Sequence, residues 1–178
     1  MSAPNLSLKV NGTTHGHSEI PSREDALVAF DHVLRAIALS DSPVLVEGGS
    51  RDARKLIAER LHLLGRRASQ PLRVCKTEKE CRPLVTDILD GDTNGNNLGT
   101  WVLRGVTEWP IEKQVELGNM LDDLDQARFH GGIKHEKVPR VIVLLSEDEE
   151  QERLAPQLQT RLSFFHISLS LNAKGAAL

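Results

Sequence analysis

The sequence predicts an α/β fold in which a five-stranded parallel sheet lies between two layers of helices. Short apolar runs alternate along the chain with segments of helical periodicity. The strongest run, Val141-Ile142-Val143-Leu144-Leu145, has no polar position, which is typical of a strand buried on both faces. Turn residues separate such runs from helix candidates of about 10–15 residues, and this alternation indicates a parallel sheet covered by helices.

The first part of the chain contains two strand candidates and three helix candidates. Residues 1–21 carry scattered polar residues without a sustained period, so we expect a flexible N-terminal arm. A capping box at 22–25 opens a helix that ends before Ser42-Pro43, because the residue before a proline avoids the helical conformation. The next elements are a strand at 44–46, a glycine-containing turn at 47–52, a helix that ends at Gly65, a strand at 72–75 and a helix at 77–91.

The second part of the chain supplies the other three strands. Pro110 stands at a favourable first-turn position for a helix, since proline lacks an amide hydrogen that this position does not use. We expect one domain at 22–171 and a C-terminal tail at 172–178. In order, its elements are a turn at 92–97, a strand at 100–103, the helix after Pro110, the apolar strand at 141–145, an acidic helix at 147–158 and an alternating strand at 165–171.

The composition is that of one soluble domain and excludes several classes of function. No apolar run approaches the roughly 20 residues of a membrane span. With 22 basic and 25 acidic residues the net charge is −3, which does not favour direct binding to DNA or to a membrane surface. Aromatic residues make up 3% of the chain, too few for a surface that stacks on single-stranded nucleic acid. The two cysteines and the absence of a secretion signal favour a cytoplasmic protein with free thiols.

The turn after the first strand stands where a phosphate-binding loop would lie, but it lacks half of the required residues. Such a loop reads G-x-x-x-x-G-K-[ST], in which glycine amides and the lysine hold phosphate and the hydroxyl holds Mg²⁺. Counted from Gly48, Ala53 replaces the second glycine, Arg54 the lysine and Lys55 the hydroxyl. Counted from Gly49, Lys55 fits the lysine position but Arg54 replaces the second glycine. By itself the turn favours an ordinary strand-to-helix connection.

A series of segments in order along the chain nevertheless resembles one known family. Residues 40–62, SDSPVLVEGGSRDARKLIAERLH, are similar to the start of the AAA+ domain of bacterial enhancer-binding proteins, the activators of sigma-54 RNA polymerase. Residues 99–110, GTWVLRGVTEWP, resemble the segment that carries the family's metal-binding motif, and 140–142 and 158–162 fit later segments. The resemblance spans 23–171 and implies a P-loop NTPase-like AAA+ α/β subdomain with sheet order 5-1-4-3-2.

Taken residue by residue, the resemblance implies that the ATPase chemistry is lost. Arg54 stands at the phosphate-loop lysine, and Arg104 and Gly105 stand at the Asp and Glu that position Mg²⁺ and the attacking water. Ser146 replaces the sensor asparagine. The resemblance thus implies a degenerate nucleotide site with no catalytic residue and no metal ligand, made of Gly48, Gly49, Ser50, Asp52, Arg54, Lys55, Arg104, Gly105 and Ser146.

The resemblance also implies that this chain lacks, or has substitutions in, the segments with which the family's proteins contact other molecules. The family's sigma-54 contact loop precedes the third strand, where this chain has the short stretch 92–98. Because the chain ends at Leu178, we expect no helical lid subdomain and no DNA-binding helix-turn-helix. Of two family arginines that reach a neighbouring subunit's nucleotide, Ala155 replaces one, and Arg161 is the remaining intersubunit candidate.

Two interpretations of the charges at this site stay open. Arg54 and Arg104 would together bind an anion without Mg²⁺, or Arg104 would form an internal ion pair, for example with Asp52. The second is favoured, since a buried charge needs a partner.

The favoured functional hypothesis is a non-hydrolysing interaction module connected with transcription regulation. It would bind a protein partner, either a functional AAA+ subunit or a second copy of itself, and would need no cofactor. The alternative is an ATP-binding regulator or weak ATPase in which Lys55 or Arg54 replaces the missing lysine, with weak ATP or ADP binding and no magnesium site. A scaffold without a specific partner is a third, weaker hypothesis.

Overall fold

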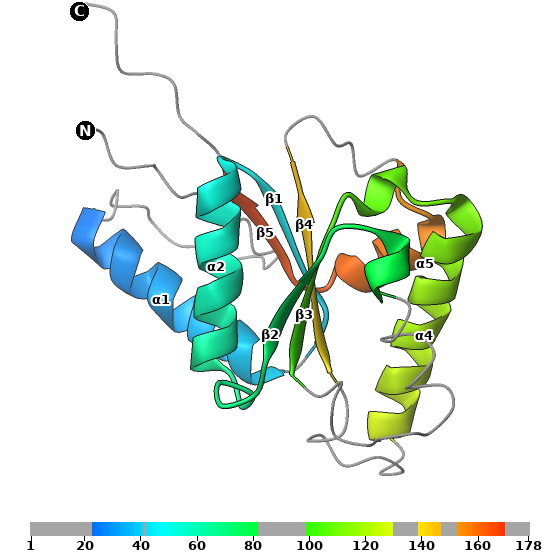
Figure 1. Cartoon of the computed structure of the whole chain (residues 1–178). Coiled ribbons are helices and arrows are strands. Elements are labelled where there is room, and N and C mark those ends of the chain that lie inside the picture. The colour runs from blue at the N-terminus through cyan, green and yellow to red at the C-terminus, as the bar shows by residue number, and fades with distance from the viewer. Residues whose placement is uncertain (1–22, 41, 82–98, 130–138, 147–152, 170–178) are drawn as a thin grey trace, which may run out of the picture.

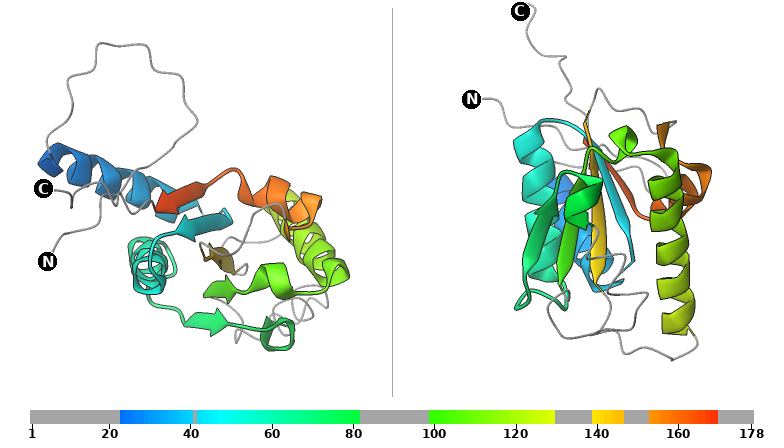
Figure 2. Two further views of the ribbon diagram at one scale, coloured as in Figure 1. Left: turned by 90° about the horizontal axis from the view of Figure 1, so that it is seen from above. Right: turned by 45° about the vertical axis from the view of Figure 1, so that its right-hand side comes forward.

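The sheet lies between two layers of helices in the computed structural model (Figures 1 and 2). Helices α1 and α2 cover one face, and α4 and α5 cover the other. The structure describes residues 23–40, 42–81, 99–129, 139–146 and 153–169. The strands are β1 (Val44–Gly48), β2 (Leu72–Cys75), β3 (Thr100–Arg104), β4 (Arg140–Leu145) and β5 (His166–Leu169). The helices are α1 (Arg23–Ser40), α2 (Arg51–Leu64), η1 (Val106–Glu108, a 3₁₀ turn), α4 (Ile111–Phe129) and α5 (Pro156–Leu162).

The strand order confirms the predicted topology. The order is β2-β3-β4-β1-β5, and every neighbouring pair is parallel. Read from the other edge this is 5-1-4-3-2, the order that the resemblance implies. Since all strands run the same way, their carboxyl ends meet at one edge, the upper edge in Figure 1.

The core forms on both faces because successive strand residues point to opposite sides. Val44, Val46 and Ile142 pack toward α1 and α2, whereas Leu45 and Val143 pack toward α4 and α5. All six residues of β4 are buried, as expected of a strand covered on both faces. Burying one such aliphatic side chain contributes about 1.5–3 kcal/mol to folding.

A buried arginine ties the two helices of one layer to the amino end of the sheet. Arg140, the first residue of β4, is 1% exposed. Its guanidinium donates hydrogen bonds to the carbonyl oxygens of Ile37 (2.7 Å), Ala38 (2.8 Å) and Leu61 (3.5 Å). These carbonyls lie near the C-terminal ends of α1 and α2, where backbone acceptors lack helical partners and a cation is favourable.

One helix boundary differs from the prediction, and other predictions fall outside the described residues. Of the predicted helix 147–158, only the residues from 153 on can be compared with the structure. There α5 begins at Pro156, where proline needs no amide partner, and runs to Leu162, so the predicted end at 158 is too early. The described part of the predicted helix 77–91 is helical at residues 78–81. The arm, the tail, the stretch 92–98 and the residues 147–152 lie outside the described residues.

The described elements contain no helical lid subdomain after β5. None of the helices in the described part of the chain has both the length and the apolar character that a membrane span needs.

Candidate functional site

The connection between β1 and α2 is much shorter than a phosphate-binding loop. Strand β1 ends at Gly48 and helix α2 begins at Arg51, so Gly49 and Ser50 alone join them. A phosphate loop instead needs an open run of residues whose amide groups surround the phosphates. Here the residues from Arg51 onward are already helical, and the connection is an ordinary strand-to-helix turn.

Two consecutive glycines allow this turn to pass close to β5. Gly48 and Gly49 both have left-handed backbones, with φ of 70° and 60°. A Cβ at Gly48 would lie 2.5 Å from the Leu169 carbonyl oxygen, and one at Gly49 would lie 2.9 Å from the Leu169 Cβ. Both positions therefore require glycine for conformation and for space.

The Arg54 side chain closes the turn from inside. Arg54 is 8% exposed, and its Nη1 donates hydrogen bonds to the carbonyl oxygens of Gly48 (2.9 Å) and Gly49 (2.5 Å). In a phosphate loop the equivalent backbone presents amide hydrogens to an anion, whereas here it presents carbonyl oxygens to a cation. The position of the missing lysine thus holds a structural arginine.

The N-terminus of α2 is capped by its own turn. Ser50 is the N-cap, and its Oγ accepts a hydrogen bond from the Ala53 amide at 3.2 Å. The Ser50 carbonyl accepts one from the Arg54 amide at 3.1 Å. The first contact satisfies the Ala53 amide, a first-turn donor without a helical partner, and the second is the first hydrogen bond of the helix itself.

The predicted ion pair between Arg104 and Asp52 is wrong. No ion pair or hydrogen bond joins these two residues, both of which the structure describes. Asp52 is exposed in the first turn of α2, where a negative charge suits the helix dipole. Asp52 is not among the residues that line the cavity beside Arg104.

A cavity lies at the carboxyl edge of the sheet, between α2 and strands β2, β3 and β4. It has two adjoining parts, of about 190 and 380 Å³. Both parts are lined by Arg51, Arg54, Lys76, Arg104 and Leu144. The smaller part adds Lys55, Ala58, Glu59, Leu72, Val74 and Val102, and the larger part adds Gly105, Glu108 and Ser146.

The cavity brings together five of the nine residues that the sequence assigns to the degenerate site. These are Arg54, Lys55, Arg104, Gly105 and Ser146, whereas Gly48, Gly49, Ser50 and Asp52 are not among its lining residues. Sequence reasoning missed Arg51 and Lys76. Lys76 directly follows β2, and the rule that ligands bind beyond the carboxyl ends of parallel strands would have selected it.

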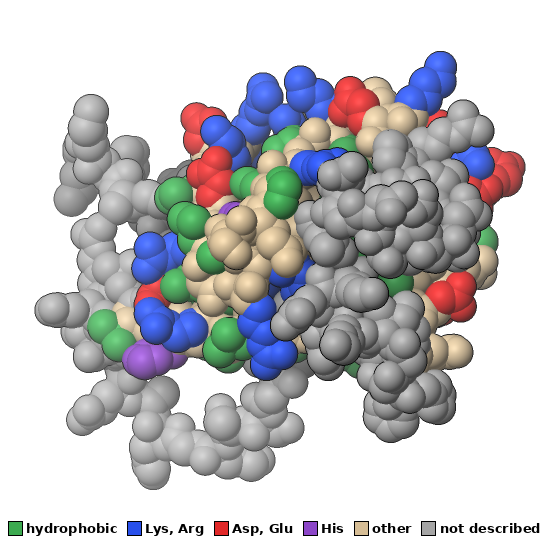
Figure 3. Space-filling model, turned by 60° about the horizontal axis from the view of Figure 1, so that its bottom comes forward, with side chains coloured by type: hydrophobic (Ala, Val, Ile, Leu, Met, Phe, Trp, Pro, Cys, Tyr) green, Lys and Arg blue, Asp and Glu red, His purple; other side chains and the backbone are tan. Residues whose placement is uncertain are grey.

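Basic side chains of α2 and β3, together with Lys76 after β2, line the cavity at this edge. On the part of the opposite edge that Figure 3 shows, basic, acidic and hydrophobic side chains are interspersed. Lys55 forms an ion pair with Glu59 at 3.5 Å, and both side chains are well exposed, so the pair adds little stability.

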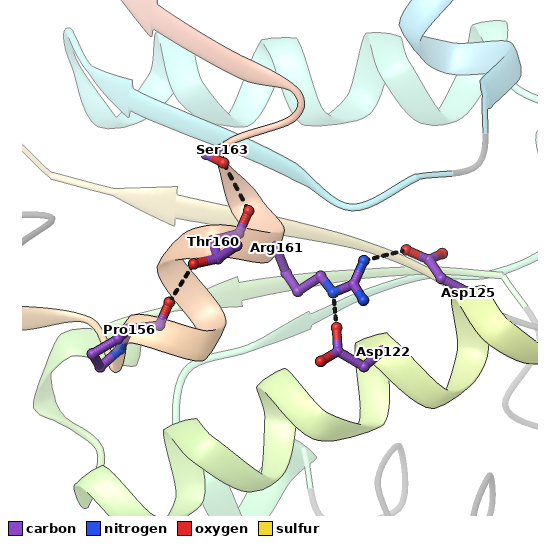
Figure 4. A network of polar contacts seen from close by, with 6 residues as sticks. All are labelled: Asp122, Asp125, Pro156, Thr160, Arg161 and Ser163. Carbon is purple, nitrogen blue, oxygen red and sulfur yellow. Dashed lines mark hydrogen bonds and ion pairs between the residues drawn. The ribbon is translucent and has the colours of Figure 1, made fainter.

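The candidate intersubunit arginine is bound within its own chain. Arg161 on α5 forms ion pairs with Asp122 and Asp125 of α4, the latter between Nη1 and Oδ2 at 3.5 Å (Figure 4). Its side chain is 26% exposed. The same view shows that Thr160 and Ser163 donate their hydroxyl hydrogens to carbonyl oxygens of α5. Helices α4 and α5 are therefore joined by Arg161 in addition to their apolar contact.

The two cysteines are free and buried, as predicted. Cys75 ends β2 and Cys81 lies in the short helical segment that follows. A hydrogen bond between the two thiols and their burial raise the pKa of Cys81, while the same bond lowers the pKa of Cys75.

Solved structures resemble this chain in fold, but comparisons of its sequence with known families and proteins find no match. No protein-family model matches the chain, and no curated protein matches it. The P-loop NTPase domain of a sigma-54 transport activator from E. coli superimposes with a TM-score of 0.59 at 16% identity, over 86% of this chain and 100% of that domain. The fold is that of a P-loop NTPase domain. The resemblance stated from the sequence is thus confirmed at the level of the fold.

Two further structures support the same assignment of the fold. NtrX from Brucella abortus matches with a TM-score of 0.57 at 20% identity, over 82% of this chain and 37% of that one. Domain III of the replication initiation protein DnaA from Thermotoga maritima matches with a TM-score of 0.50 at 14% identity, over 85% of this chain and 65% of that one. The chain therefore spans the whole E. coli domain but only a part of the NtrX chain.

Proposed function

We propose that this protein is a non-hydrolysing P-loop NTPase-fold module that acts in the cytoplasm by binding a protein partner and is connected with transcription regulation. The observation that carries the proposal is the position of Arg54, whose guanidinium binds the Gly48 and Gly49 carbonyls inside the turn. A nucleotide phosphate would have to displace this cation from two hydrogen bonds and then face carbonyl oxygens, which repel an anion.

The residues at the metal end of the site do not fit Mg²⁺ either. Arg104 stands at the end of β3, where Mg²⁺ would need an oxygen ligand such as a carboxylate. The described residues contain no group of three or more side chains suited to hold a metal ion. Phosphoryl transfer depends on such positioning and electrostatics, which supports a role without hydrolysis.

An exposed aromatic residue supports the interaction role. Phe164, which follows the C-cap residue of α5, is 71% exposed, the largest exposed fraction among the exposed large hydrophobic residues that the structure describes. It lies three positions from Arg161. Aromatic and arginine side chains are the residue types that dominate protein interfaces. We propose that this corner contacts the partner, which is a functional AAA+ subunit or a second copy of the chain.

The nucleotide-binding alternative makes a different prediction for the same turn. An ATP-binding regulator or weak ATPase would need Arg54 or Lys55 to act on phosphates. Arg54 would have to leave its two carbonyl partners, and Lys55 would have to leave Glu59. The alternative would therefore require the β1–α2 turn to rearrange on binding.

Calorimetric titration with ATP and ADP, with and without Mg²⁺, tests the proposal. We expect no Mg²⁺-dependent binding and no phosphate release. Micromolar Mg²⁺-dependent binding, or measurable turnover, would overturn the non-hydrolysing role. The quadruple variant Ala53→Gly, Arg54→Lys, Arg104→Asp and Gly105→Glu is the matched control, because it restores the residues that the family uses at these positions.

Sedimentation and affinity capture test the interaction role. Self-association of the wild-type chain that Phe164→Ser weakens would identify a second copy as the partner. If the chain stays monomeric, an AAA+ subunit captured from cell extract by the wild type and lost with Phe164→Ser would identify that partner. Capture that is equal for both chains would contradict the proposed contact.

A further inference from the structure

We propose that the cavity between α2 and the carboxyl ends of β2 and β3 binds a small organic phosphate without a divalent metal ion. The inference rests on the proposed function in one respect, namely that the ligand is bound and not hydrolysed. It concerns a different part of the edge from the β1–α2 turn, because the turn glycines do not line this cavity.

The cavity is lined by more basic side chains than acidic ones. Its lining holds five basic side chains against two carboxylates, Glu59 and Glu108, in a protein of net charge −3. The basic residues are Arg51, Arg54, Lys55, Lys76 and Arg104. A concave site lined by one sign of charge concentrates its field and attracts ions of the opposite sign.

Three of the five cations have no protein partner among the described residues. Arg54 is held by carbonyl oxygens of the turn, and Lys55 is paired with Glu59. In contrast, the described residues supply no hydrogen bond or ion pair to the side chains of Arg51, Lys76 and Arg104. Arg104 is in addition half-buried, so part of its hydration is lost without a compensating protein contact.

These three cations come from separate elements that the fold brings together. Arg51 begins α2, Lys76 follows β2 and Arg104 ends β3. β2 and β3 are paired through Cys75 and Leu103, the residues just before Lys76 and Arg104. The two side chains therefore start from adjacent points of one rigid sheet edge, and the arrangement does not depend on a loop.

The chemistry of the lining favours a phosphate monoester. A guanidinium presents parallel N–H donors that match phosphate oxygens, and the ammonium of Lys76 adds a third charge. The smaller part of the cavity is walled by Ala58, Leu72, Val74 and Val102, which suits an apolar group attached to the phosphate. No metal is needed, because three cations already supply the positive charge that Mg²⁺ provides for a nucleotide.

The carboxylate of Glu108 places a limit on the ligand. Glu108 lines the larger part of the cavity, on the η1 turn after β3. A phosphate bound there would be repelled, so we place the phosphate between Arg51, Lys76 and Arg104.

The test is calorimetric titration of the full chain in EDTA with three probes, inorganic phosphate, phenyl phosphate and ADP. We expect phenyl phosphate to bind more tightly than inorganic phosphate, since its ring meets the apolar wall. Arg104→Ala and Lys76→Ala should each weaken phenyl phosphate at least about tenfold, which corresponds to about 1.4 kcal/mol. Binding of ADP that depends on the same residues would identify a nucleotide as the source of the phosphate.

Two further variants test whether binding depends on this cavity and on its apolar wall. Arg66→Ala removes an exposed arginine just beyond the opposite end of α2 and should leave binding unchanged. Val74→Asn, at a position 47% exposed, should weaken phenyl phosphate but not inorganic phosphate. A cooperative thermal transition without ligand shows that each variant folds. Phenyl phosphate should raise the Tm of the wild type and raise it less in the variants that bind weakly, because a ligand of the native state raises its Tm.

The proposal is overturned if no probe binds at millimolar concentration, or if Arg66→Ala weakens binding as much as Arg104→Ala. The second result would indicate general charge attraction in place of a site. Failure of the proposed function is a separate outcome, because it appears as Mg²⁺-dependent ATP binding or turnover. Such turnover would leave the metal-free binding of phenyl phosphate and its loss in Arg104→Ala unaltered.

Discussion

The Arg54 guanidinium donates a hydrogen bond to the Gly48 carbonyl oxygen at 2.9 Å, across the turn that joins β1 to α2. Gly48 is the glycine at which a phosphate loop would start, and Arg54 stands where its lysine would be. In a phosphate loop, residues at these two positions would both act on a phosphate. Here they form a hydrogen bond with each other. The turn is therefore complete without a ligand.

Arg54→Met should destabilise the fold, because it leaves the carbonyls of Gly48 and Gly49 without their charged donor. Each such charge-assisted hydrogen bond contributes about 1.5–3 kcal/mol, so we expect a loss of about 3 kcal/mol in the free energy of unfolding. Urea denaturation measures it. The neighbour Lys55→Met is the control, and its loss should stay within about 0.5 kcal/mol because its ion pair with Glu59 is exposed. Equal losses in the two variants would contradict the role of Arg54.

Comparing Gly48→Ala with Gly105→Ala distinguishes the loss of stability due to backbone strain from the loss due to a steric clash. Both glycines have a left-handed backbone, with φ of 70° and 63°, and alanine costs about 1–2 kcal/mol in that conformation. At Gly48 the new Cβ would also lie 2.5 Å from the Leu169 carbonyl oxygen, whereas at Gly105 the nearest heavy atom is 3.6 Å away. Thermal denaturation should therefore show a clearly larger loss for Gly48→Ala. A similar loss at both sites would show that β5 gives way.

Arg140→Leu should weaken the attachment of α1 and α2 to the sheet. The substitution removes hydrogen bonds to the carbonyls of Ile37, Ala38 and Leu61 from the buried start of β4. We expect a loss of about 3 kcal/mol in the free energy of unfolding, as for other broken buried networks. Hydrogen exchange should detect faster opening at the C-terminal turns of both helices. Arg66→Leu, an exposed arginine near the same end of α2, is the control and should leave exchange there unchanged.

Stability should fall as the pH drops below about 6.5, the unperturbed pKa of histidine, in part through His62. Burial and the nearby charge of Arg140 lower the pKa of His62, and its Nδ1 lies 2.9 Å from the Thr100 hydroxyl. A group with a lowered pKa in the folded state binds a proton more readily when unfolded. Its contribution is therefore present above the unfolded pKa and lost as the pH falls toward the folded one.

Urea denaturation between pH 7.5 and pH 5 measures this effect. His62→Gln cannot be protonated, so its stability should change less with pH over this interval than that of the wild type. Parallel pH profiles for the two chains would exclude His62 as a source of the dependence.

Most of the fold could be predicted because its signals are local. The apolar run at 141–145 is long enough to identify a strand buried on both faces, and β4 is such a strand. The end of the helix before β5 was predicted too early, at 158, whereas α5 runs to Leu162. The site was predicted only in part. The family resemblance identifies Arg104 as a substituted position, but Asp52, the partner proposed for it, is exposed on α2 and does not contact it.

By itself the sequence determined the order of strands and helices, the resemblance that implies sheet order 5-1-4-3-2, and the residues that replace the phosphate-loop motif. The tertiary structure decided what those residues contact. Arg140 reaches a carbonyl 102 positions away, and Arg161 binds α4. Lys76 lines the same cavity as Arg104 because β2 pairs with β3. Periodicity and turn chemistry act between neighbours in the chain, whereas side-chain partners depend on which distant segments the packed sheet brings together.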